Sequence, residues 1–323
     1  MTKMVIQIPC YNEQESLPVA LAALPRALPG IDVIEWLVID DGSSDRTSEV
    51  ARAHGVDHVI RLPRHRGLAH AFMAGLEGSL QAGADIIVNT DADNQYRASD
   101  IPKLVEPILE GRAEMVIGAR AIGSINHFSL LKKTFQHLGS WVTRVISSTD
   151  VHDAPSGFRA ISRSAAMQLH VFNGFTYTIE TIIQAGQKGM AVTSVPISIN
   201  EDLRPSRLIK GVGRYMGRQL LTMVRVFVTY KPFRFFAVSG LALFGAGLGV
   251  ALRFLYYYLG GDGSGHVQSL ILAALLMGMG FFLLIVGLLA DLLAVNRTLL
   301  EGLEWRLKRL EERFPASTDT WKP

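Results

Sequence analysis

The sequence has little cysteine, little net charge and no lysine or arginine in the turn at 260–265 that lies between its two longest apolar runs. Cys10 is the single cysteine, which excludes an intrachain disulfide and a zinc site made of several cysteines, and fits a reducing compartment. The chain carries 32 basic and 29 acidic residues, a balance that does not indicate nucleic acid as a partner. Met4 to Pro9 is short and followed by polar residues, so we expect no signal peptide at the start.

What the sequence does have is apolar residues, which make up 49% of its 323 residues. Residues 235–252 and 270–290 are both free of charge, and the first run alone makes about 27 Å of helix. Basic residues flank the pair, while the turn at 260–265 has none. We therefore predict two transmembrane helices within 235–292 in a multi-pass cell-membrane protein, with the catalytic domain and the C-terminus cytoplasmic.

Amphipathic stretches lie on both sides of this hairpin. Residues 206–234 interleave basic and apolar side chains, which predicts juxtamembrane helices on the membrane surface. Residues 293–323 predict a cytoplasmic amphipathic helix and a polar tail, with apolar side chains at heptad spacing that favour a homo-oligomer: Leu303, Leu307, Leu310 and Phe314. The glycines at 240, 245, 247 and 249 permit close helix approach or face lipid.

Residues 1–205 form the predicted catalytic domain, because short apolar runs alternate there with helical stretches. This pattern predicts an α/β fold of Rossmann-like type, with a mostly parallel sheet and helices on both faces. Ligands of such sheets bind at the carboxyl ends of the strands. The expected strands are 5–8, 34–39, 59–62, 85–88, 115–118 and 192–199, and the expected helices are 15–27, 45–54, 67–82, 99–110 and 177–188.

The most informative strand end is the one that runs from Ile86 into Asp91, Asp93 and Gln95. Two carboxylates at the end of a buried strand are costly to desolvate and repel one another, and a divalent cation removes both problems. Mg²⁺ or Mn²⁺ is bound by one or two carboxylates together with substrate phosphate oxygens. The alternative is that the two acids only cap the turn before the helix near Ser99.

The first two strands also end in polar side chains that suit a nucleotide. The first ends in Pro9, Tyr11, Asn12 and Glu13, and the second in the adjacent acids at 40 and 41. Helix capping is the alternative for Asn12 and Glu13, and it is the main role that we expect of Asp45. The adjacent acids are harder to explain by capping, so Asp40 stays a candidate for nucleotide contact.

Taken together, four spaced motifs resemble the family 2 glycosyltransferases of GT-A fold, over about residues 4–230. The motifs are Pro9-x-Tyr11-Asn12-Glu13, Asp40-Asp41-Gly42-Ser43-x-Asp45, Gly67-Leu-Ala69 and Asp91-Ala-Asp93-x-Gln95. Gly118-Ala-Arg120 and Asp153-Ala-Pro-Ser156-Gly157-Phe158 resemble the subgroup of polyprenyl-phosphate sugar synthases. The resemblance implies inverting transfer of a hexose from a UDP- or GDP-linked donor to a polyprenyl phosphate.

The resemblance also implies roles for individual residues. Asp91, Asp93 and Gln95 match the metal-binding positions, and the nucleotide-contacting positions match Pro9, Tyr11, Glu13 and Asp40. A phosphate acceptor is already anionic at neutral pH, so cations and not a general base should surround it. The candidate cations are Arg120, Lys132, Lys133, His137 and Arg159.

These cations differ in how well they match the subgroup. Arg120, Lys133 and His137 fall on acceptor-phosphate positions, where the last two stand in place of the usual Arg and Ser; a solvated helix face is the alternative for Lys133. Asp153 is expected to contact the donor sugar or to orient Arg159. Arg207 lies in a Pro-broken basic loop and is expected to grip the diphosphate, to contact lipid headgroups, or both.

Three other functions are alternatives to hexose transfer onto a polyprenyl phosphate. A hydroxyl acceptor would need a general base, for which Glu180 is the best candidate unless it is an ordinary helix acid. A polysaccharide synthase is disfavoured, because two spans make no pore and a Gln-x-x-Arg-Trp motif is absent. A catalytically silent membrane scaffold is disfavoured by the intact Asp91, Asp93, Gln95 and Arg120. We therefore predict a membrane-bound hexosyltransferase.

Overall fold

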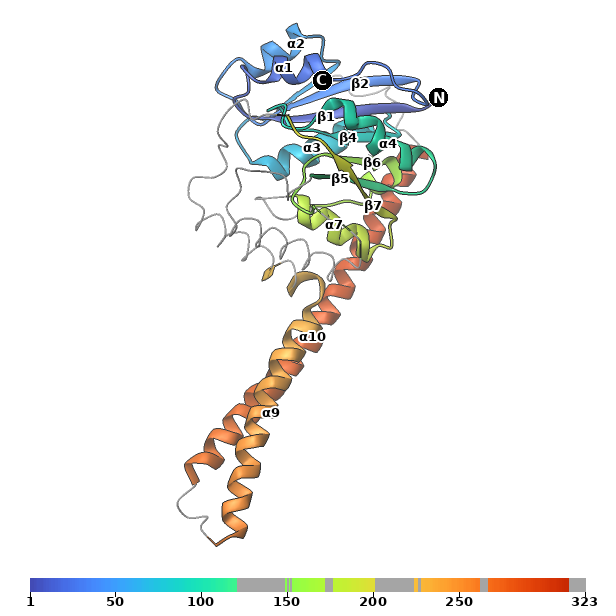
Figure 1. Cartoon of the computed structure of the whole chain (residues 1–323). Coiled ribbons are helices and arrows are strands. Elements are labelled where there is room, and N and C mark those ends of the chain that lie inside the picture. The colour runs from blue at the N-terminus through green and yellow to red at the C-terminus, as the bar shows by residue number, and fades with distance from the viewer. Residues whose placement is uncertain are drawn as a thin grey trace, which may run out of the picture. The chain divides into compact units, whose positions relative to one another are not determined.

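The computed structural model describes residues 1–120, 149, 151, 153–171, 177–200, 224–225, 228–261 and 267–313. The chain divides into two compact units, Met1–Lys210 and Gly211–Pro323. The first unit contains a sheet with helices packed on it, and the second contains two long helices (Figure 1). Each unit is taken by itself below.

The sheet of the first unit has seven strands in the order β3-β2-β1-β4-β6-β5-β7. All neighbouring pairs are parallel except the two that involve β6. The predicted mostly parallel sheet is therefore confirmed. The strands are β1 (Lys3–Cys10), β2 (Val33–Asp40), β3 (His58–Arg61), β4 (Ile86–Asn89), β5 (Met115–Arg120), β6 (Arg159–Ser162) and β7 (Val192–Ile197).

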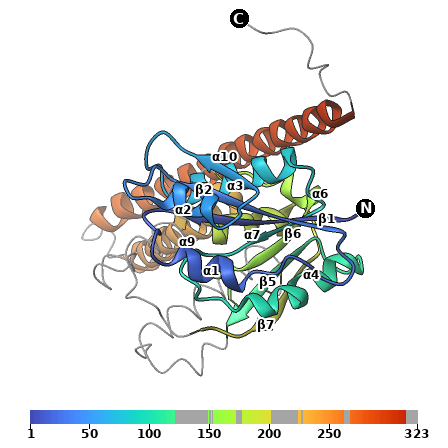
Figure 2. The same ribbon diagram turned by 90° about the horizontal axis from the view of Figure 1, so that it is seen from above.

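Helices cover both faces of this sheet, as the continuous apolar runs of its central strands require. On one face Ile6 and Ile8 pack with Leu21 of α1 and Leu104 of α4. The other face, which carries Gln7, receives α3, and Figure 2 shows α1 and α4 on one side of the sheet and α3 and α6 on the other. The helices are α1 (Leu17–Ala23), α2 (Thr47–Ala53), α3 (Leu68–Gln81), α4 (Ile101–Leu109, after the 3₁₀ turn η1 at Ala98–Asp100), α6 (Arg163–Ala166) and α7 (Thr178–Gln187).

Strand β6 is the element that the sequence pattern did not predict. It has four residues, begins with a fully buried arginine and lies antiparallel between β4 and β5. Arg159 is paired with Asn89 on one side and with Ile117 on the other. A strand this short, with a charged residue inside the fold, has neither the length nor the alternation that identifies strands from sequence.

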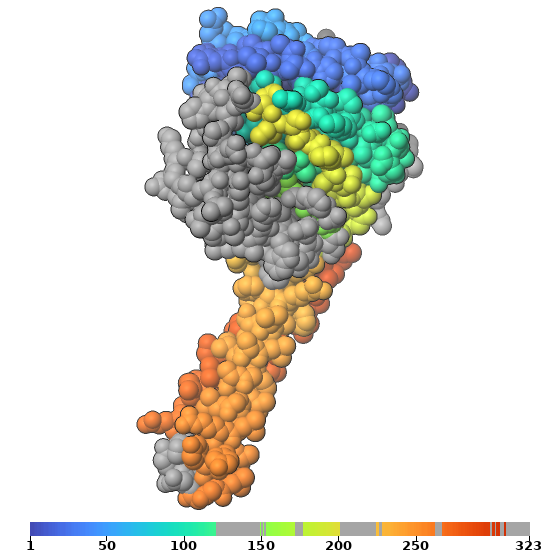
Figure 3. All heavy atoms as spheres, in the orientation of Figure 1, coloured from blue at the N-terminus to red at the C-terminus, as the bar shows by residue number. Residues whose placement is uncertain are grey.

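The second unit contains two helices long and apolar enough to cross a membrane. They are Pro232–Leu259 (α9) and the first part of α10, Val267–Arg297, with mean hydropathies of 2.0 and 2.7. Only 17% of the most apolar window of each helix is buried, and the outward side chains of α9 form the orange surface in Figure 3. The predicted runs at 235–252 and 270–290 fall inside these helices. Such exposed apolar surface makes both helices candidates for membrane spans.

Helix α10 extends from Val267 to Arg313, across residue 293, where the sequence pattern places the boundary between the second span and the amphipathic helix. Its 47 residues make about 70 Å of helix, more than twice the hydrocarbon thickness of a bilayer. The predicted amphipathic helix is thus a continuation of the second span, up to Arg313. Most of the juxtamembrane stretch predicted at 206–234 lies outside the described residues.

Glycines bring α9 and α10 into close contact. A Cβ on Gly240 would stand 2.8 Å from the carbonyl oxygen of Gly280, and one on Gly247 would stand 2.8 Å from the backbone nitrogen of Met277. Gly245 and Gly249 have no such neighbour within 4 Å among the described residues. Close approach of the helices therefore holds for Gly240 and Gly247, and the expectation that Gly245 and Gly249 face lipid stays a prediction.

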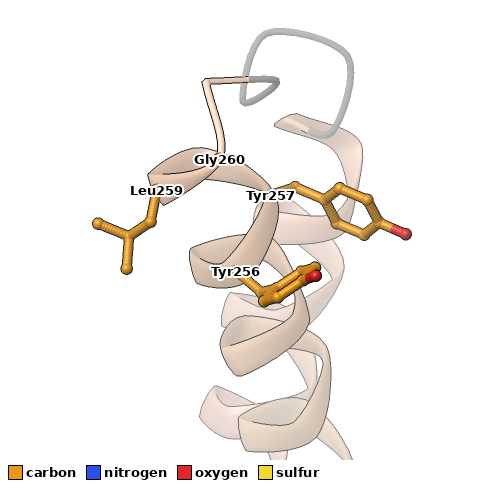
Figure 4. Close-up of a pocket in the computed structure, with 4 residues that line it drawn as sticks. All are labelled: Tyr256, Tyr257, Leu259 and Gly260. Carbon is orange, nitrogen blue, oxygen red and sulfur yellow. The ribbon is translucent and has the colours of Figure 1, made fainter.

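The tip of the hairpin is aromatic. A hollow of about 470 Å³ at the end of α9 is lined by Tyr256, Tyr257, Leu259 and Gly260 (Figure 4). Tyr256 and Tyr258 are 76% and 62% exposed, and the guanidinium of Arg253 lies 5.8 Å from the ring of Tyr257. Exposed tyrosines beside an arginine are typical of a membrane interface. None of the four described residues that line the hollow is acidic or basic.

Candidate functional site

Polar residues meet at the edge of the sheet where four parallel strands end. Asp40 and Arg120 are the last residues of β2 and β5, Asn12 follows β1, and Asp91 follows β4. Strand β6 is antiparallel, so it starts at this same edge with Arg159. The strand order β2-β1-β4-β6-β5 places Asp91 between the ends of β1 and β2 on one side and the end of β5 on the other.

The carboxylate of Asp91 has no hydrogen-bond or ion-pair partner among the described residues. The residue is half-buried. Burial, and next the negative charge of Asp93, raise the pKa of Asp91 to about 7. Such a group is stabilised by a cation. Asp93 holds its own turn by accepting the backbone N–H of Gln95 at 3.1 Å.

These residues suit a hard divalent cation. The structure shows no cluster of three His, Cys, Asp or Glu side chains that would enclose a metal by itself in the described ranges. Two carboxylates and an amide are instead the donor set of a Mg²⁺ or Mn²⁺ ion that takes its remaining ligands from water and substrate phosphate. Asp91, Asp93 and Gln95 therefore fit the metal that the sequence predicted.

The turn from Asp91 to Tyr96 is held by the chain that follows β7. The side chain of Asn200 donates to the carbonyl of Asn94 at 2.8 Å, and its backbone N–H donates to the carbonyl of Gln95 at 2.8 Å. Asn94 has a φ of 56°, a left-handed conformation that asparagine tolerates. Tyr96 is 4% exposed and stacks on Phe158 at 5.0 Å. The acids thus project from a fixed turn.

Arg120 is clamped by Asp153. Its Nε and Nη2 donate to the two carboxylate oxygens at 2.7 and 3.0 Å, and its backbone N–H donates to Asp153 at 3.2 Å. The carboxylate is fully buried, while the arginine side chain is 13% exposed. Burial opposes the arginine's charge, but Tyr96 and Asp153 outweigh it and raise the pKa of Arg120. Its Nη1 has no hydrogen-bond partner in the part of the chain that the structure describes.

Arg159 lies deeper than the sequence predicted. It is fully buried, and its guanidinium donates to the carbonyl of Ser156, to the carbonyl of Thr178 at 3.3 Å and to Thr181 Oγ1 at 2.7 Å. Burial lowers its pKa. The expectations that it faces the acceptor and that Asp153 orients it are corrected: Asp153 pairs with Arg120, and Arg159 supports the loop beneath.

On the opposite side of the site, an aromatic platform follows β1. The ring of Tyr11 is 41% exposed and stacks on His65 at 3.9 Å. His65 Nδ1 lies 2.8 Å from a carboxylate oxygen of Asp41. His65 has no signal in the sequence, because its link to Asp41 joins two loops and leaves no local pattern. Pro9 is a buried residue of β1.

The acidic pair at the end of β2 shapes the loops around the platform. Asp40 is 1% exposed and accepts hydrogen bonds from Ser43 N at 2.8 Å and from the hydroxyl of Ser48. Asp41 accepts the backbone N–H groups of Arg66 and Gly67, both at 2.8 Å. The structure thus places Asp40 behind the site wall, although the sequence predicted that it contacts the nucleotide.

Asn12 and Glu13 also take part in loop structure. Asn12 has a φ of 55°, and its side-chain oxygen accepts the backbone N–H of Ser44 at 2.9 Å. The backbone N–H of Glu13 donates to Thr47 Oγ1 at 2.9 Å. Asp45 accepts the backbone N–H of Thr47 at 3.0 Å in the turn before α2, but the N-cap position of that helix is Arg46 and not, as the sequence predicted, Asp45.

The comparison with known proteins decides the family. The profile described as "Glycosyl transferase family 2" matches residues 5–169, half of the chain. The chain belongs to glycosyl transferase family 2. This family 2 enzyme is a glycosyltransferase, and the resemblance found in its motifs is confirmed.

Two relatives of this glycosyltransferase carry informative names. An undecaprenyl-phosphate mannosyltransferase of Micrococcus luteus is 29% identical over 64% of this chain and 87% of its own length. A polyprenol monophosphomannose synthase of Mycolicibacterium smegmatis is 26% identical over 62% of this chain and 78% of its own length.

Solved structures agree on the fold. Glucosyl-3-phosphoglycerate synthase of Mycobacterium tuberculosis, in a complex with Mn²⁺, UDP and its product, matches with a TM-score of 0.52 at 21% identity, over 69% of this chain and 80% of the other. The same enzyme with Mg²⁺ and UDP also gives 0.52, at 20% identity, over 69% and 79%. The glycosyltransferase therefore has the GT-A-like fold that the sequence predicted.

The remaining predicted residues are four that lie outside the described residues, and Glu180. The four are Lys132, Lys133, His137 and Arg207. Glu180 lies in the first turn of α7 and is 5% exposed. The described site thus contains the turn from Asp91 to Tyr96, the Arg120–Asp153 pair and the stacked rings of Tyr11 and His65.

Proposed function

We propose that this glycosyltransferase transfers a hexose from a nucleotide-diphosphate sugar to a polyprenyl phosphate, with inversion and with Mg²⁺ or Mn²⁺, at the cytoplasmic membrane face. The observation that carries the proposal is the uncompensated carboxylate of Asp91 between the Tyr11 platform and Arg120. The names of the two relatives support a polyprenyl-phosphate acceptor, and make a mannosyl donor the first to test.

The donor side uses Asp91, Asp93 and Gln95 to hold the cation. The metal, when bound, neutralises the charge that develops on the departing nucleoside diphosphate. Tyr11 offers an exposed ring on which a base stacks, and His65 supports that ring from behind. Arg207 is proposed to contact the diphosphate.

The acceptor side needs positive charge and no general base. A phosphomonoester with a second pKa near about 6 is already a nucleophile at neutral pH. Asp153 fixes two nitrogens of Arg120 and leaves Nη1 for the acceptor phosphate. Lys133 and His137 are proposed to add to this cluster. Because the buried carboxylate of Asp153 holds the guanidinium of Arg120, that guanidinium is oriented before the acceptor arrives. This lowers the entropy cost of binding the acceptor phosphate.

The order of strands accounts for the proposed inversion. The proposed donor groups that follow β1 and β4 lie on one side of the sheet edge, and Arg120 at the end of β5 lies on the other. A phosphate held at Arg120 attacks the anomeric carbon from the side opposite the diphosphate. One displacement of this kind inverts the configuration and forms a new C–O bond as the C–O bond to the diphosphate breaks.

The apolar hairpin accounts for a lipid acceptor. Both candidate spans expose most of their surface, as lipid-facing helices do. Basic residues before α9 and after the second span, with none in the connecting turn, support cytoplasmic ends. A soluble acceptor would not require such an anchor.

No observation favours the alternative functions. Glu180, the base that a hydroxyl acceptor would need, is 5% exposed within α7. A silent scaffold has no use for a half-buried carboxylate whose pKa is raised to about 7. The phosphate-acceptor proposal uses both Asp91 and Arg120.

The test is a transfer assay with the full-length protein in detergent. Radiolabelled GDP-mannose, UDP-glucose and related donors are each incubated with undecaprenyl phosphate and Mg²⁺ or Mn²⁺. We expect a labelled lipid from one donor, and none after EDTA treatment. Absence of labelled lipid with every donor refutes the proposed function.

A further inference from the structure

Gly157 lies close to the Asp91 carboxylate. A Cβ at this position would stand 3.0 Å from the hydroxyl of Tyr177 and 3.2 and 3.3 Å from the two carboxylate oxygens, so one of these neighbours would have to move by a few tenths of an ångström. Gly157 is not among the residues with positive φ, so its backbone conformation does not require glycine. The crowding comes from Tyr177 and Asp91.

The peptide groups of Gly157 are held from two directions. Its N–H donates to the hydroxyl of Tyr96 at 3.1 Å. Its carbonyl accepts the side-chain amide of Asn89 at 2.8 Å, and that amide also donates to Tyr177 at 2.9 Å. Asn89 is fully buried and Tyr96 is 4% exposed, so water does not replace these bonds.

The orientation of the Asn89 side chain is fixed by a neighbouring strand. Its oxygen accepts the amide of Gln7 on β1 at 2.8 Å, which leaves its nitrogen to donate to Gly157. Asn89 precedes Asp91 and Tyr96 follows it. The turn that carries the acid is therefore tied at both ends to the backbone of Gly157, the residue at which an added Cβ would crowd the acid.

We propose that Asn89 and Tyr96 are positioning residues that hold the Gly157 peptide, and through it the Asp91 carboxylate, in the orientation that a divalent cation needs. The proposal rests on the proposed function only in taking Asp91 as a metal ligand. Partners behind a metal ligand commonly change metal affinity by about 10- to 100-fold when they are removed.

The experiment measures binding of Mn²⁺ and not transfer. Full-length protein in detergent is titrated with Mn²⁺ in the presence of UDP or GDP, and free Mn²⁺ is followed by its electron paramagnetic resonance signal. We expect Gly157→Ala to weaken Mn²⁺ binding about tenfold or more, because its methyl group displaces Asp91. Tyr96→Phe removes a single hydroxyl group, and we expect it to weaken binding in the same direction.

Gly118→Ala is the matched control. A Cβ at Gly118 is equally crowded, at 2.9 Å from Ile197 and 3.2 Å from Phe158, but both neighbours are apolar. We expect this variant to unfold at a lower temperature in metal-free buffer and to keep the Mn²⁺ affinity of the parent. Loss of affinity that follows loss of stability in all variants alike would show an ordinary structural role and overturn the proposal.

Two further results overturn it. One is unchanged Mn²⁺ affinity in either Gly157→Ala or Tyr96→Phe, and if the first variant does not fold, the second decides alone. The other is an unmodified protein that binds no Mn²⁺ with either nucleotide. A protein that binds Mn²⁺ with the expected variant pattern but labels no lipid supports this proposal and refutes the proposed function, so the two failures are distinct.

Discussion

Replacing Asp91 by asparagine should stabilise the metal-free protein while it abolishes transfer. The carboxylate is half-buried without a partner among the described residues, and its pKa is raised from 3.8 to about 7. When the pKa of an acid is raised on folding, the protein loses stability as the pH rises from the unfolded pKa to the folded pKa. The cost of ionising the Asp91 carboxyl in the folded protein is therefore absent below pH 3.8 and complete above pH 7. An asparagine at this position does not ionise and removes that cost.

The size of the effect follows from that shift. At 1.36 kcal/mol per unit, a rise from 3.8 to about 7 corresponds to about 4 kcal/mol at pH 8. Partial exposure and relaxation of the turn reduce this to about 2 kcal/mol. For a unit of this size, we expect Asp91→Asn to raise the unfolding temperature by about 4–8 °C at pH 8. At pH 5 the gain should be smaller, because less of the folded parent's carboxyl is ionised at that pH.

Thermal unfolding in detergent with EDTA, at pH 5 and pH 8, measures this difference. Adding Mn²⁺ and nucleotide should then raise the unfolding temperature of the parent and leave that of Asp91→Asn unchanged. A variant that is no more stable than the parent at pH 8, or whose gain is as large at pH 5, contradicts the assignment of Asp91 as an uncompensated acid.

The other predictions concern the second acid, the arginine clamp and the hairpin. Asp93→Asn should abolish transfer and keep the unfolding temperature in metal-free buffer, because the amide oxygen still accepts the hydrogen bond of its turn; marked destabilisation would indicate a structural role. Arg120→Lys should raise the KM for the lipid acceptor about tenfold and leave nucleotide affinity unchanged, since lysine cannot make both bonds to Asp153 and also reach a phosphate; an equal loss for both substrates would place the arginine elsewhere. Gly247→Leu should lower the yield of folded protein, whereas Gly249→Leu, which has open space in the described structure, should not; equal yields would deny close packing of the hairpin.

The parts of the fold that were predictable carry strong local patterns. The strands at β1, β2 and β4 are continuous apolar runs, because both faces of the sheet are covered. The two apolar helices were recognisable from uncharged runs alone. Strand β6 was not, since its identity depends on being paired between β4 and β5 and not on its own four residues.

Sequence motifs predicted which residues belong to the site, but not which of these residues pair with one another. Motifs identified Asp91 and Arg120, but which carboxylate pairs with which arginine depends on where a distant loop returns to the sheet edge. Asp153 therefore could not be assigned to Arg120 in advance. Likewise, the burial of Asp40 follows from hydrogen bonds within its own loop, which a polar motif does not distinguish from exposure.

The central claim is that the acceptor is an anionic phosphate held opposite a metal-bound donor. The most direct test offers the full-length protein undecaprenyl phosphate and undecaprenol side by side, with the donor and metal that support activity, and measures labelled product from each. The account predicts product from the phosphate alone, because no base serves a hydroxyl in the described site. Product from undecaprenol at a comparable rate would contradict it.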